Sequence, residues 1–163
     1  MMAHDAKRKI TGRWAVGRSL MPAHNAFSEV RVTVGAAAHE FSEDFNATEF
    51  AISPKSDRMG IRLAGLALVR NTTRELISAA VGPGTVQVPP DGAPIVLMAD
   101  APTIGGYPCL AHVIHHDLPL LAQARPGDRV RFVTVSLAEA HRLWRKEERD
   151  LHILQEGLRP RFT

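Results

Sequence analysis

Apolar and polar residues alternate in several short stretches of the chain, and this pattern predicts a mainly β protein. The alternation is clearest at Val30–Val34, where every second residue is apolar, as in a strand with one buried face. Further short apolar runs are bounded by Gly, Pro or polar residues and predict strands at 50–53, 61–69, 85–88, 95–98, 111–114 and 130–135. Gly65 is expected to mark a bulge. The segment Pro89-Pro90-Asp91-Gly92 has the composition of a tight turn between two strands.

Helical spacing is clearest near the C-terminal end. Ser136-Leu137-Ala138-Glu139 fits a capping box, in which a serine hydroxyl and a glutamate carboxylate each accept an N–H group at a helix start. Gly157 is expected to end this helix. Its apolar stripe is expected to contact the core or another subunit, and consists of Leu137, Ala140, Trp144, Leu151 and Leu154.

Two shorter helices are expected, one within 36–44 and one capped by the Asp117 carboxylate and running to Gln123. Many short strands, a turn-rich middle and one long helix together predict a small closed β-barrel with helical lids. The expected organisation is a basic, loosely ordered N-terminal arm, a barrel domain, and a C-terminal helix with its tail, at residues 1–27, 28–136 and 137–163.

The composition is that of one globular domain. The chain has 163 residues, of which 45% are hydrophobic and 23% charged, within the range of soluble proteins. No apolar run approaches the roughly 20 residues that a membrane-spanning helix needs. The single cysteine, Cys109, cannot form an internal disulfide, which favours a reducing compartment. A cytoplasmic location is therefore expected.

The net charge of +3 comes from one end of the chain. Residues 1–35 carry six basic and two acidic groups, and the rest carries 14 basic and 15 acidic groups. Nucleic-acid binders usually concentrate basic groups on a folded surface, whereas here a neutral body follows a basic tail. No nucleic-acid partner is expected.

Three polar segments contain candidate chemistry. Ser56-Asp57-Arg58, with Arg62 nearby, offers an acceptor and guanidinium groups that can bind a carboxylate. Gln87 precedes a rigid turn, and its amide can both donate to and accept from a lactam or ureido group. Asp100 follows an apolar strand and could act as a general base, and the loop after it carries Thr103, Gly105, Gly106 and Tyr107.

Each of these segments also has a structural interpretation. Asp57 could form an ion pair with Arg58 or Arg62 that holds its loop together. The Gln87 amide could bind loop backbone, and Asp100 could cap a turn in which Tyr107 packs. The neighbouring residues His112, His115, His116 and Asp117 do not predict a metal site, because alternation along a strand separates their side chains. Cys109 is not expected to be a nucleophile, because Pro108 and Leu110 suggest an apolar setting.

The order and spacing of three blocks resemble the second half of allophanate hydrolase subunit 2 proteins. These blocks are Ser56–Gly65, then Glu75 and Ser78 leading into Gly84–Ile95, and finally Met98–Asp128, which includes Gly105-Gly106-Tyr107-Pro108. The resemblance covers residues 28–140 and extends to KipA-type proteins, the C subunit of prokaryotic 5-oxoprolinase and the carboxyltransferase domain of urea amidolyase.

The resemblance implies a cyclophilin-like β-barrel that works beside a subunit 1 (KipI-type) partner. It also implies ATP-dependent opening of 5-oxoproline to glutamate, or carboxyl transfer from carboxybiotin, with a separate N-terminal half to complete the protein. In that setting the expected catalytic residues are Asp100 and Tyr107. The expected substrate-binding residues are Ser56, Arg58, Arg62, Gln87, Thr103, Gly105 and Gly106.

Some positions depart from the family pattern. Ala93, Ala101, Pro102 and Ile104 stand where relatives usually have polar residues, and they remove hydrogen-bonding capacity from the expected pocket. Two alternatives to an enzyme subunit therefore stay open: a non-catalytic KipA-like binding module, and a remnant of a split subunit. No cofactor is assigned to this chain; ATP or biotin is expected only in the assembled enzyme, and a homo-oligomer stays open as an alternative.

Overall fold

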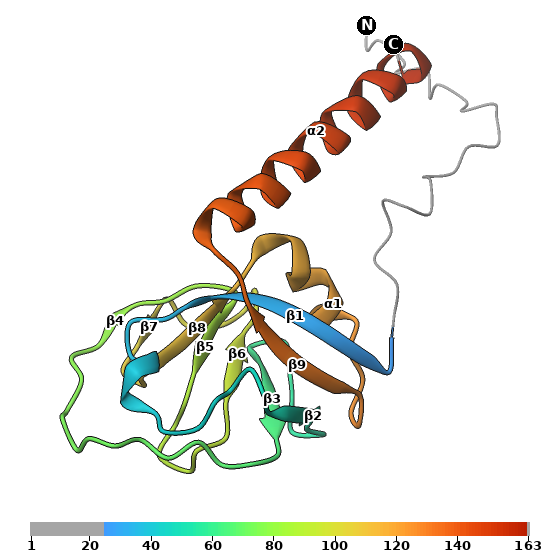
Figure 1. The fold of residues 1–163 in the computed structure, drawn as a ribbon. Helices are drawn as coiled ribbons and strands as arrows, with labels where there is room; N and C mark the ends of the chain where they lie inside the picture. Colours follow the sequence, from blue (N-terminus) through green and yellow to red (C-terminus); the bar gives the residue numbers. More distant parts are fainter. Residues whose placement is uncertain (1–24, 163) are drawn as a thin grey trace, which may run out of the picture.

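The structure, a computed structural model, describes residues 25–162 and is built around a closed β-barrel (Figure 1). The predicted N-terminal arm lies outside these residues apart from its last three positions, and position 27 already belongs to a strand. The strands of the barrel are β1 (Phe27–Val34), β2 (Glu49–Ile52), β3 (Gly60–Ala64), β5 (Thr85–Gln87), β6 (Ile95–Leu97), β8 (Cys109–Val113) and β9 (Arg129–Thr134). The mainly β barrel fold with a C-terminal helix is thereby confirmed.

The barrel has the strand order β1-β8-β5-β6-β3-β2-β9. Its closure joins the first strand to the last: β1 and β9 run parallel, with Val30 opposite Phe132, and the other neighbours are antiparallel. Parallel neighbours need a long connection. The connection between β1 and β9 contains all the other strands of the barrel.

The core is filled by the inward-facing residues of these strands. Val30 and Val32 of β1 are fully buried, while Val34 at the strand end is exposed. Phe132 of β9 lies at the centre of an aromatic group, with its ring centroid 5.9 Å from that of Phe50 and 6.3 Å from that of Phe45. Centroid separations in this range are favourable for tilted and edge-to-face aromatic pairs.

Within residues 25–162, a short two-stranded ribbon and four helical segments complete the fold. The ribbon pairs β4 (Ala79–Ala80) with β7 (Ile104–Gly105) and was not predicted. The helical segments are the 3₁₀ turns η2 (Ala38–Glu40) and η3 (His115–Asp117), followed by α1 (Leu118–Ala122) and α2 (Leu137–Phe162).

Several boundaries differ from those expected from the sequence. The run at 61–69 forms a strand only to Ala64, and the remaining apolar residues belong to a loop. The irregularity expected at Gly65 instead occurs in β5, between Val86 and Gln87, where the pairing with β8 shifts register. The helix expected within 36–44 is reduced to the three-residue turn η2.

Asp117 has a different role from the predicted cap. Its carboxylate makes no bond to the start of α1 and instead accepts three hydrogen bonds from Arg31 of β1. The donors are the Arg31 backbone N–H, Nε and Nη2, at 2.8, 2.9 and 2.5 Å. The hydrogen bond to Asp117 is the main cause that raises the pKa of Arg31. Because Asp117 is only 1% exposed, this bidentate pair is the principal buried ionic link between the barrel wall and η3.

Helix α2 extends away from the barrel after β9 (Figure 1). Its start has half of the predicted capping box: the Glu139 N–H donates to Ser136 Oγ at 3.2 Å, but the Glu139 carboxylate binds Arg142. The bond to Arg142 lowers the pKa of Glu139. The helix also continues through Gly157, which was expected to end it.

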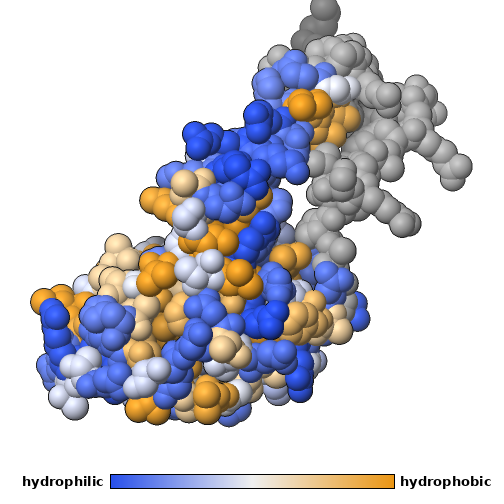
Figure 2. All heavy atoms as spheres, in the orientation of Figure 1, coloured by the Kyte–Doolittle hydropathy of each residue, from blue (hydrophilic) through white to orange (hydrophobic). Residues whose placement is uncertain are grey.

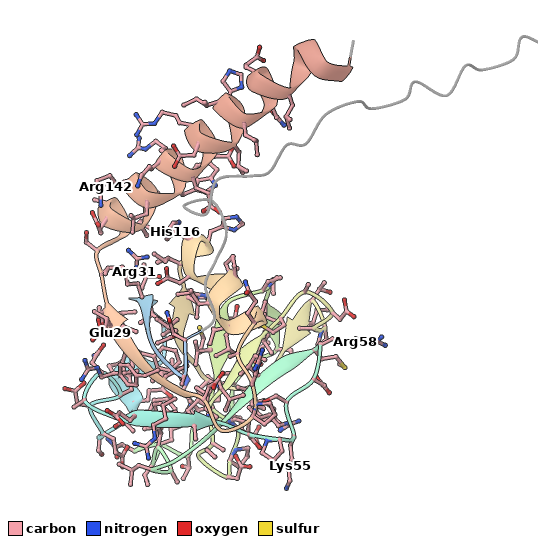
Figure 3. All side chains as sticks on the ribbon, turned by 90° about the vertical axis from the view of Figure 1, so that its right-hand side faces the viewer. Glu29, Arg31, Lys55, Arg58, His116 and Arg142 are labelled. Atoms are coloured by element: carbon pink, nitrogen blue, oxygen red, sulfur yellow. The ribbon has the colours of Figure 1, made fainter. Side chains whose placement is uncertain are left out.

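The predicted apolar stripe of α2 does not face the core of this chain. Leu137, Trp144 and Leu151 are 63%, 47% and 46% exposed, and Figure 2 shows apolar side chains (orange) interrupting the polar surface of the helix. The buried residue is Leu143, on the side that packs on η3. Nδ1 of His116 lies 3.4 Å from Oε2 of Glu147 across the same contact, and Figure 3 shows His116 and Arg31 on the side of the barrel nearest to the helix.

Within residues 25–162, none of the helices combines the length and the apolar character needed to cross a lipid bilayer.

We expect Asp117→Ala to lower the free energy of unfolding by about 3 kcal/mol, because it leaves the partly buried Arg31 guanidinium without its partner. Denaturant titration followed by circular dichroism measures this change. Asp100→Asn is the control: it breaks an exposed ion pair and should cost less than about 1 kcal/mol. Equal losses in the two variants would contradict a special role for the Arg31–Asp117 pair.

Candidate functional site

The predicted site residues form two groups rather than one. In the antiparallel pair of β5 and β6, Gln87 lies opposite Ile95 at the start of β6, whereas Asp100 follows the end of the same strand. The register therefore places Gln87 and Asp100 at opposite ends of β6. The three polar segments therefore do not all meet at one end of the barrel.

The first group surrounds Arg58 and Asp100. Arg58 Nε lies 3.1 Å from Asp100 Oδ2, and the two side chains are 86% and 55% exposed. Figure 3 shows Arg58 directed outward from the barrel. The Asp100 carboxylate thus faces a surface guanidinium, and Asp100 does not belong to the groove described below. Nothing in this arrangement desolvates Asp100 or prepares it as a general base.

The loop before β3 is organised by bonds within itself. Asp57 Oδ1 accepts the N–H groups of Met59 and Gly60 at 2.8 and 3.1 Å, in place of the ion pair considered for it. Ser56 Oγ accepts the N–H of Arg62 at 3.0 Å and donates to its carbonyl oxygen at 3.3 Å. Ser56 and Asp57 therefore stabilise the turn before β3. Their role is structural, although Asp57 acts through backbone N–H groups and not through an ion pair.

The second group surrounds Gln87, a buried polar residue on β5 that is 5% exposed. Val86 points into the core, so alternation directs Gln87 to the outer face, beneath the ribbon of β4 and β7. Its Nε2 donates to the carbonyl oxygen of Tyr107 at 3.2 Å. A Cβ atom added to Gly105 would lie only 2.6 Å from that Nε2, so the glycine allows the two segments to approach.

The remaining loop residues connect the two groups. The carbonyl oxygen of Thr103 accepts the N–H of Val81 at 3.0 Å, next to the β4–β7 pairing. Gly105 lies in β7 and Gly106 follows it near Ser78. Thr103 and Gly105 therefore have backbone roles in this ribbon, and Tyr107 emerges beyond it with half of its side chain exposed.

Tyr107 lines a groove of about 500 Å³ on the outside of the barrel. Its walls come from the loop after β3, the Pro-Pro turn after β5 and the segment before β8, with one residue from the end of η2. They comprise Phe41, Ala67–Arg70, Thr72–Leu76, Val88–Gly92 and Gly106–Pro108. The volume is within the range of small-molecule sites, and the walls combine apolar surface with a few polar groups, as such sites do.

The groove keeps its shape because its walls are bonded to one another. The Leu68 N–H donates to the Gly92 carbonyl oxygen at 2.9 Å. Gly92 has φ +75°, and a Cβ atom there would lie 2.9 Å from the Leu68 carbonyl oxygen, so the turn requires glycine. The N–H of Asn71 donates to the Glu40 carbonyl oxygen at 2.7 Å, and that of Val69 to Glu43 Oε2 at 2.9 Å.

Arg70 is the most constrained charged residue of the groove wall, with its side chain 21% exposed. Its Nε donates to Glu40 Oε2 at 2.6 Å and its Nη1 to the Arg74 carbonyl oxygen at 2.8 Å. The hydrogen bond from Arg70 is the main cause that lowers the pKa of Glu40. Nη2 of Arg70 is buried and has no hydrogen-bond partner among residues 25–162.

Cys109 lies at the start of β8, half buried. Burial raises the pKa of its thiol, as its apolar neighbours predicted. Its Sγ lies 3.3 Å from Nε2 of His112. A thiol whose pKa is raised is a poor nucleophile at neutral pH, which agrees with the prediction for this residue.

The sequence of the chain matches the model of one protein family. The model of the carboxyltransferase domain, subdomain A and B, matches residues 2–134. The chain belongs to this family. The match ends just before helix α2, so the helix lies beyond the part of the chain that defines a carboxyltransferase-domain protein.

Relatives within the carboxyltransferase-domain family include subunits of known enzymes. The chain is 51% identical to the 5-oxoprolinase C subunit of Haemophilus influenzae over 100 residues, covering 61% of this chain and 32% of that one. It is 44% identical to that of Escherichia coli over 126 residues, covering 75% and 41%. The chain thus spans less than half the length of these relatives.

Solved structures show the same fold. The urea amidolyase of K. lactis superposes with a TM-score of 0.73 at 23% identity, over 82% of this chain and 9% of that one. The protein TTHA0988 superposes with a TM-score of 0.66 at 32% identity, over 79% and 25%. The barrel fold therefore also occurs within much longer proteins.

Arg70 was missed by sequence reasoning. It ends an apolar run that was interpreted as a strand, so its side chain was not considered for a site. The usable signal was the break in alternation after Gly65, followed by the polar stretch from Asn71 to Glu75. Such a stretch indicates a loop, and ligand-binding residues often lie on loops held by a rigid scaffold.

We expect Gly105→Ala to destabilise the protein by about 1 kcal/mol, because the new methyl group displaces the Gln87 amide from the Tyr107 carbonyl oxygen. Thermal unfolding measures this. Gly106→Ala is the matched control, since its Cβ would meet only Ser78 Oγ at 3.4 Å. Equal destabilisation by the two substitutions would show that the close approach of Gly105 to Gln87 does not cause the loss of stability.

Proposed function

We propose that this chain is part of a 5-oxoprolinase-type enzyme and contributes one wall of its substrate site. The groove beside Tyr107 is the observation that carries the proposal, because it joins the Gly106-Tyr107 segment to a wall that contains Arg70, in a space suited to a small molecule. The identity of 44–51% to two C subunits of 5-oxoprolinase supports the reaction class. The reaction is the ATP-dependent opening of 5-oxoproline to glutamate.

In this proposal Tyr107 is the residue of the chain that meets the lactam. Its side chain is half exposed at the groove, and a phenol can donate to a carbonyl oxygen or accept from an amide N–H. Gln87 acts as a positioning residue, since its amide holds the Tyr107 backbone. ATP or biotin is assigned to the assembled enzyme and not to this chain.

A subunit 1 (KipI-type) protein and the remaining part of a C subunit are the proposed partners. Two relatives are named as C subunits of 5-oxoprolinase, and this chain spans 32–41% of their length. Leu137, Trp144 and Leu151 recur every seven residues along one exposed face of α2. Seven-residue spacing of apolar residues is typical of a helix that packs along another helix.

One observation favours the alternative, a non-catalytic binding module of KipA type. Asp100, the expected general base, pairs with Arg58 on the surface, and the loop after it carries the exposed apolar Ile104. In this alternative the groove, whose lining includes Glu75 and Asp91, would serve recognition alone, because the expected base Asp100 lies outside it.

We expect 5-oxoproline-dependent ATP hydrolysis when the chain is co-expressed with a subunit 1 protein and the rest of a C subunit as a separate polypeptide. Tyr107→Phe should lower kcat/KM by about tenfold, the size expected for one lost hydrogen bond in a site. Asp100→Asn should leave kcat/KM unchanged, because Asp100 lies outside the groove. Stable complexes without turnover would favour the binding module over the enzyme.

We expect Trp144→Ala to weaken binding of the subunit 1 partner by about tenfold or more, as aromatic anchors in interfaces do. Calorimetric titration of the partner measures this. The unfolding temperature of the isolated chain should hardly change, because Trp144 is 47% exposed. Leu143→Ala should behave differently and lower the unfolding temperature, since Leu143 is buried. Unchanged partner affinity in Trp144→Ala would place the interface elsewhere.

A further inference from the structure

We propose that Arg70 is the carboxylate-binding residue of the groove, and that the groove takes a small carboxylic acid whose ring carries a lactam. This deepens the proposed function and rests on it for the lactam. The carboxylate is inferred independently, from the contacts of Arg70. Arg58 and Arg62, the arginines expected to bind a carboxylate, lie outside the groove.

The contacts of Arg70 leave one edge of its guanidinium without acceptors. Glu40 binds Nε through one oxygen, and the Arg74 carbonyl oxygen uses one N–H of Nη1. Nη2 has no partner among the described residues, although it is buried. A buried donor without an acceptor costs free energy, and a charged donor costs more than a neutral one. A ligand oxygen at this edge would remove that cost.

The chemistry of the free edge favours a carboxylate over a neutral acceptor. The Nη1 and Nη2 groups of a guanidinium carry parallel N–H bonds, whose spacing matches the two oxygens of a planar carboxylate. Arg74, Glu75 and Asp91 also line the groove, so its charged residues are of both signs. The paired donors of Arg70, rather than net charge, would therefore select the carboxylate. A single carbonyl oxygen would use only one of the two N–H bonds.

The rest of the groove limits the shape of the acid. Leu68 and Val88 are buried and line it, and Pro89 and Pro108 add further apolar surface to its walls. A compact ring can lie against this surface with its carboxylate at Arg70 and its amide near the Tyr107 hydroxyl. The volume of about 500 Å³ admits a ligand of this size without filling.

Glu40 is the positioning residue in this arrangement. Its bond to Arg70 holds the guanidinium in one orientation, and η2, which carries Glu40, is anchored to the barrel by the bond from the Ala37 N–H to the Cys109 carbonyl oxygen at 2.9 Å. The carboxylate of a ligand would therefore meet a guanidinium already fixed in place, which lowers the entropy cost of binding.

Binding of three probes to the full chain tests the proposal: 5-oxoproline, 2-pyrrolidinone, which lacks the carboxylate, and cyclopentanecarboxylate, which lacks the lactam. We expect both acids to bind, and 2-pyrrolidinone to bind about tenfold more weakly than 5-oxoproline. Amide resonances of Arg70, Arg74 and Tyr107 should shift in the NMR spectrum of the wild-type protein. Shifts confined to other surfaces, equal affinity for 2-pyrrolidinone, or no binding of either acid would overturn the proposal.

Arg70→Lys keeps the charge beside Glu40 but loses the planar pair of donors. We expect it to weaken 5-oxoproline binding by about tenfold while leaving 2-pyrrolidinone unaffected. Arg58→Lys, the same change outside the groove, should alter neither. Thermal unfolding reports whether each variant is folded. If Arg70→Lys does not fold, the shifts of the Arg70, Arg74 and Tyr107 resonances in the wild-type protein test the carboxylate site instead.

The two proposals fail in different ways. If the assembled enzyme turns over 5-oxoproline and Arg70→Lys leaves KM unchanged, the role of Arg70 is wrong and the function stands. If the chain binds the acids through Arg70 but no assembly hydrolyses ATP in response, the carboxylate site stands and the enzymatic function is wrong.

Discussion

The parallel pairing of β1 with β9 is the constraint on which the structure depends. It joins residues about a hundred positions apart, so the whole chain between them is enclosed by this one pairing, at a large cost in loop-closure entropy. The pairing buries Val30 and Phe132 side by side at its centre. It also brings Arg31 to the surface of β1 that faces η3, where Asp117 holds it, and it delivers the chain to the start of α2. Each loop of the groove is thereby anchored at both ends by a closed sheet.

The strands could be predicted from the sequence because some of their side chains are buried in the core and others are exposed to solvent. Val30 and Val32 are buried while Val34 at the strand end is exposed, and alternation records that difference directly. The pattern fails where apolar residues serve a loop: Leu68 is buried under the groove although it lies outside any strand. It also fails for Asp117, whose position before α1 is that of a cap. The partly buried Arg31 of β1 binds the Asp117 carboxylate, which makes no side-chain bond to the helix start.

The candidate site was predictable only in part, for a reason of topology. Gln87 and Tyr107 come together because β5 pairs with β8, and their segments had been recognised. Asp100 was grouped with them because it is close in sequence, but the antiparallel register of β5 and β6 sends it to the far end. Arg70 depends on a contact with Glu40 across 30 positions, which neither periodicity nor spacing reveals. The local pattern of apolar and polar residues identifies strands and helices. Which side chains come into contact depends on the register in which the strands pair.

The groove is consistent with a chain that supplies only part of a larger site. Its rigid side is the barrel turn at Gly92, and its other side is the loop 72–76, whose described hydrogen bonds are few: Arg70 Nη1 to the Arg74 carbonyl oxygen, and the Arg74 N–H to Thr72 Oγ1. The same arginine therefore holds this loop and carries the donor without an acceptor. Filling that donor would add bonds where the wall has fewest, so ligand binding and ordering of the loop stabilise one another. In the proposed assembly, a partner protein that contacts this loop would strengthen the same coupling, and the groove would then gain affinity for its ligand.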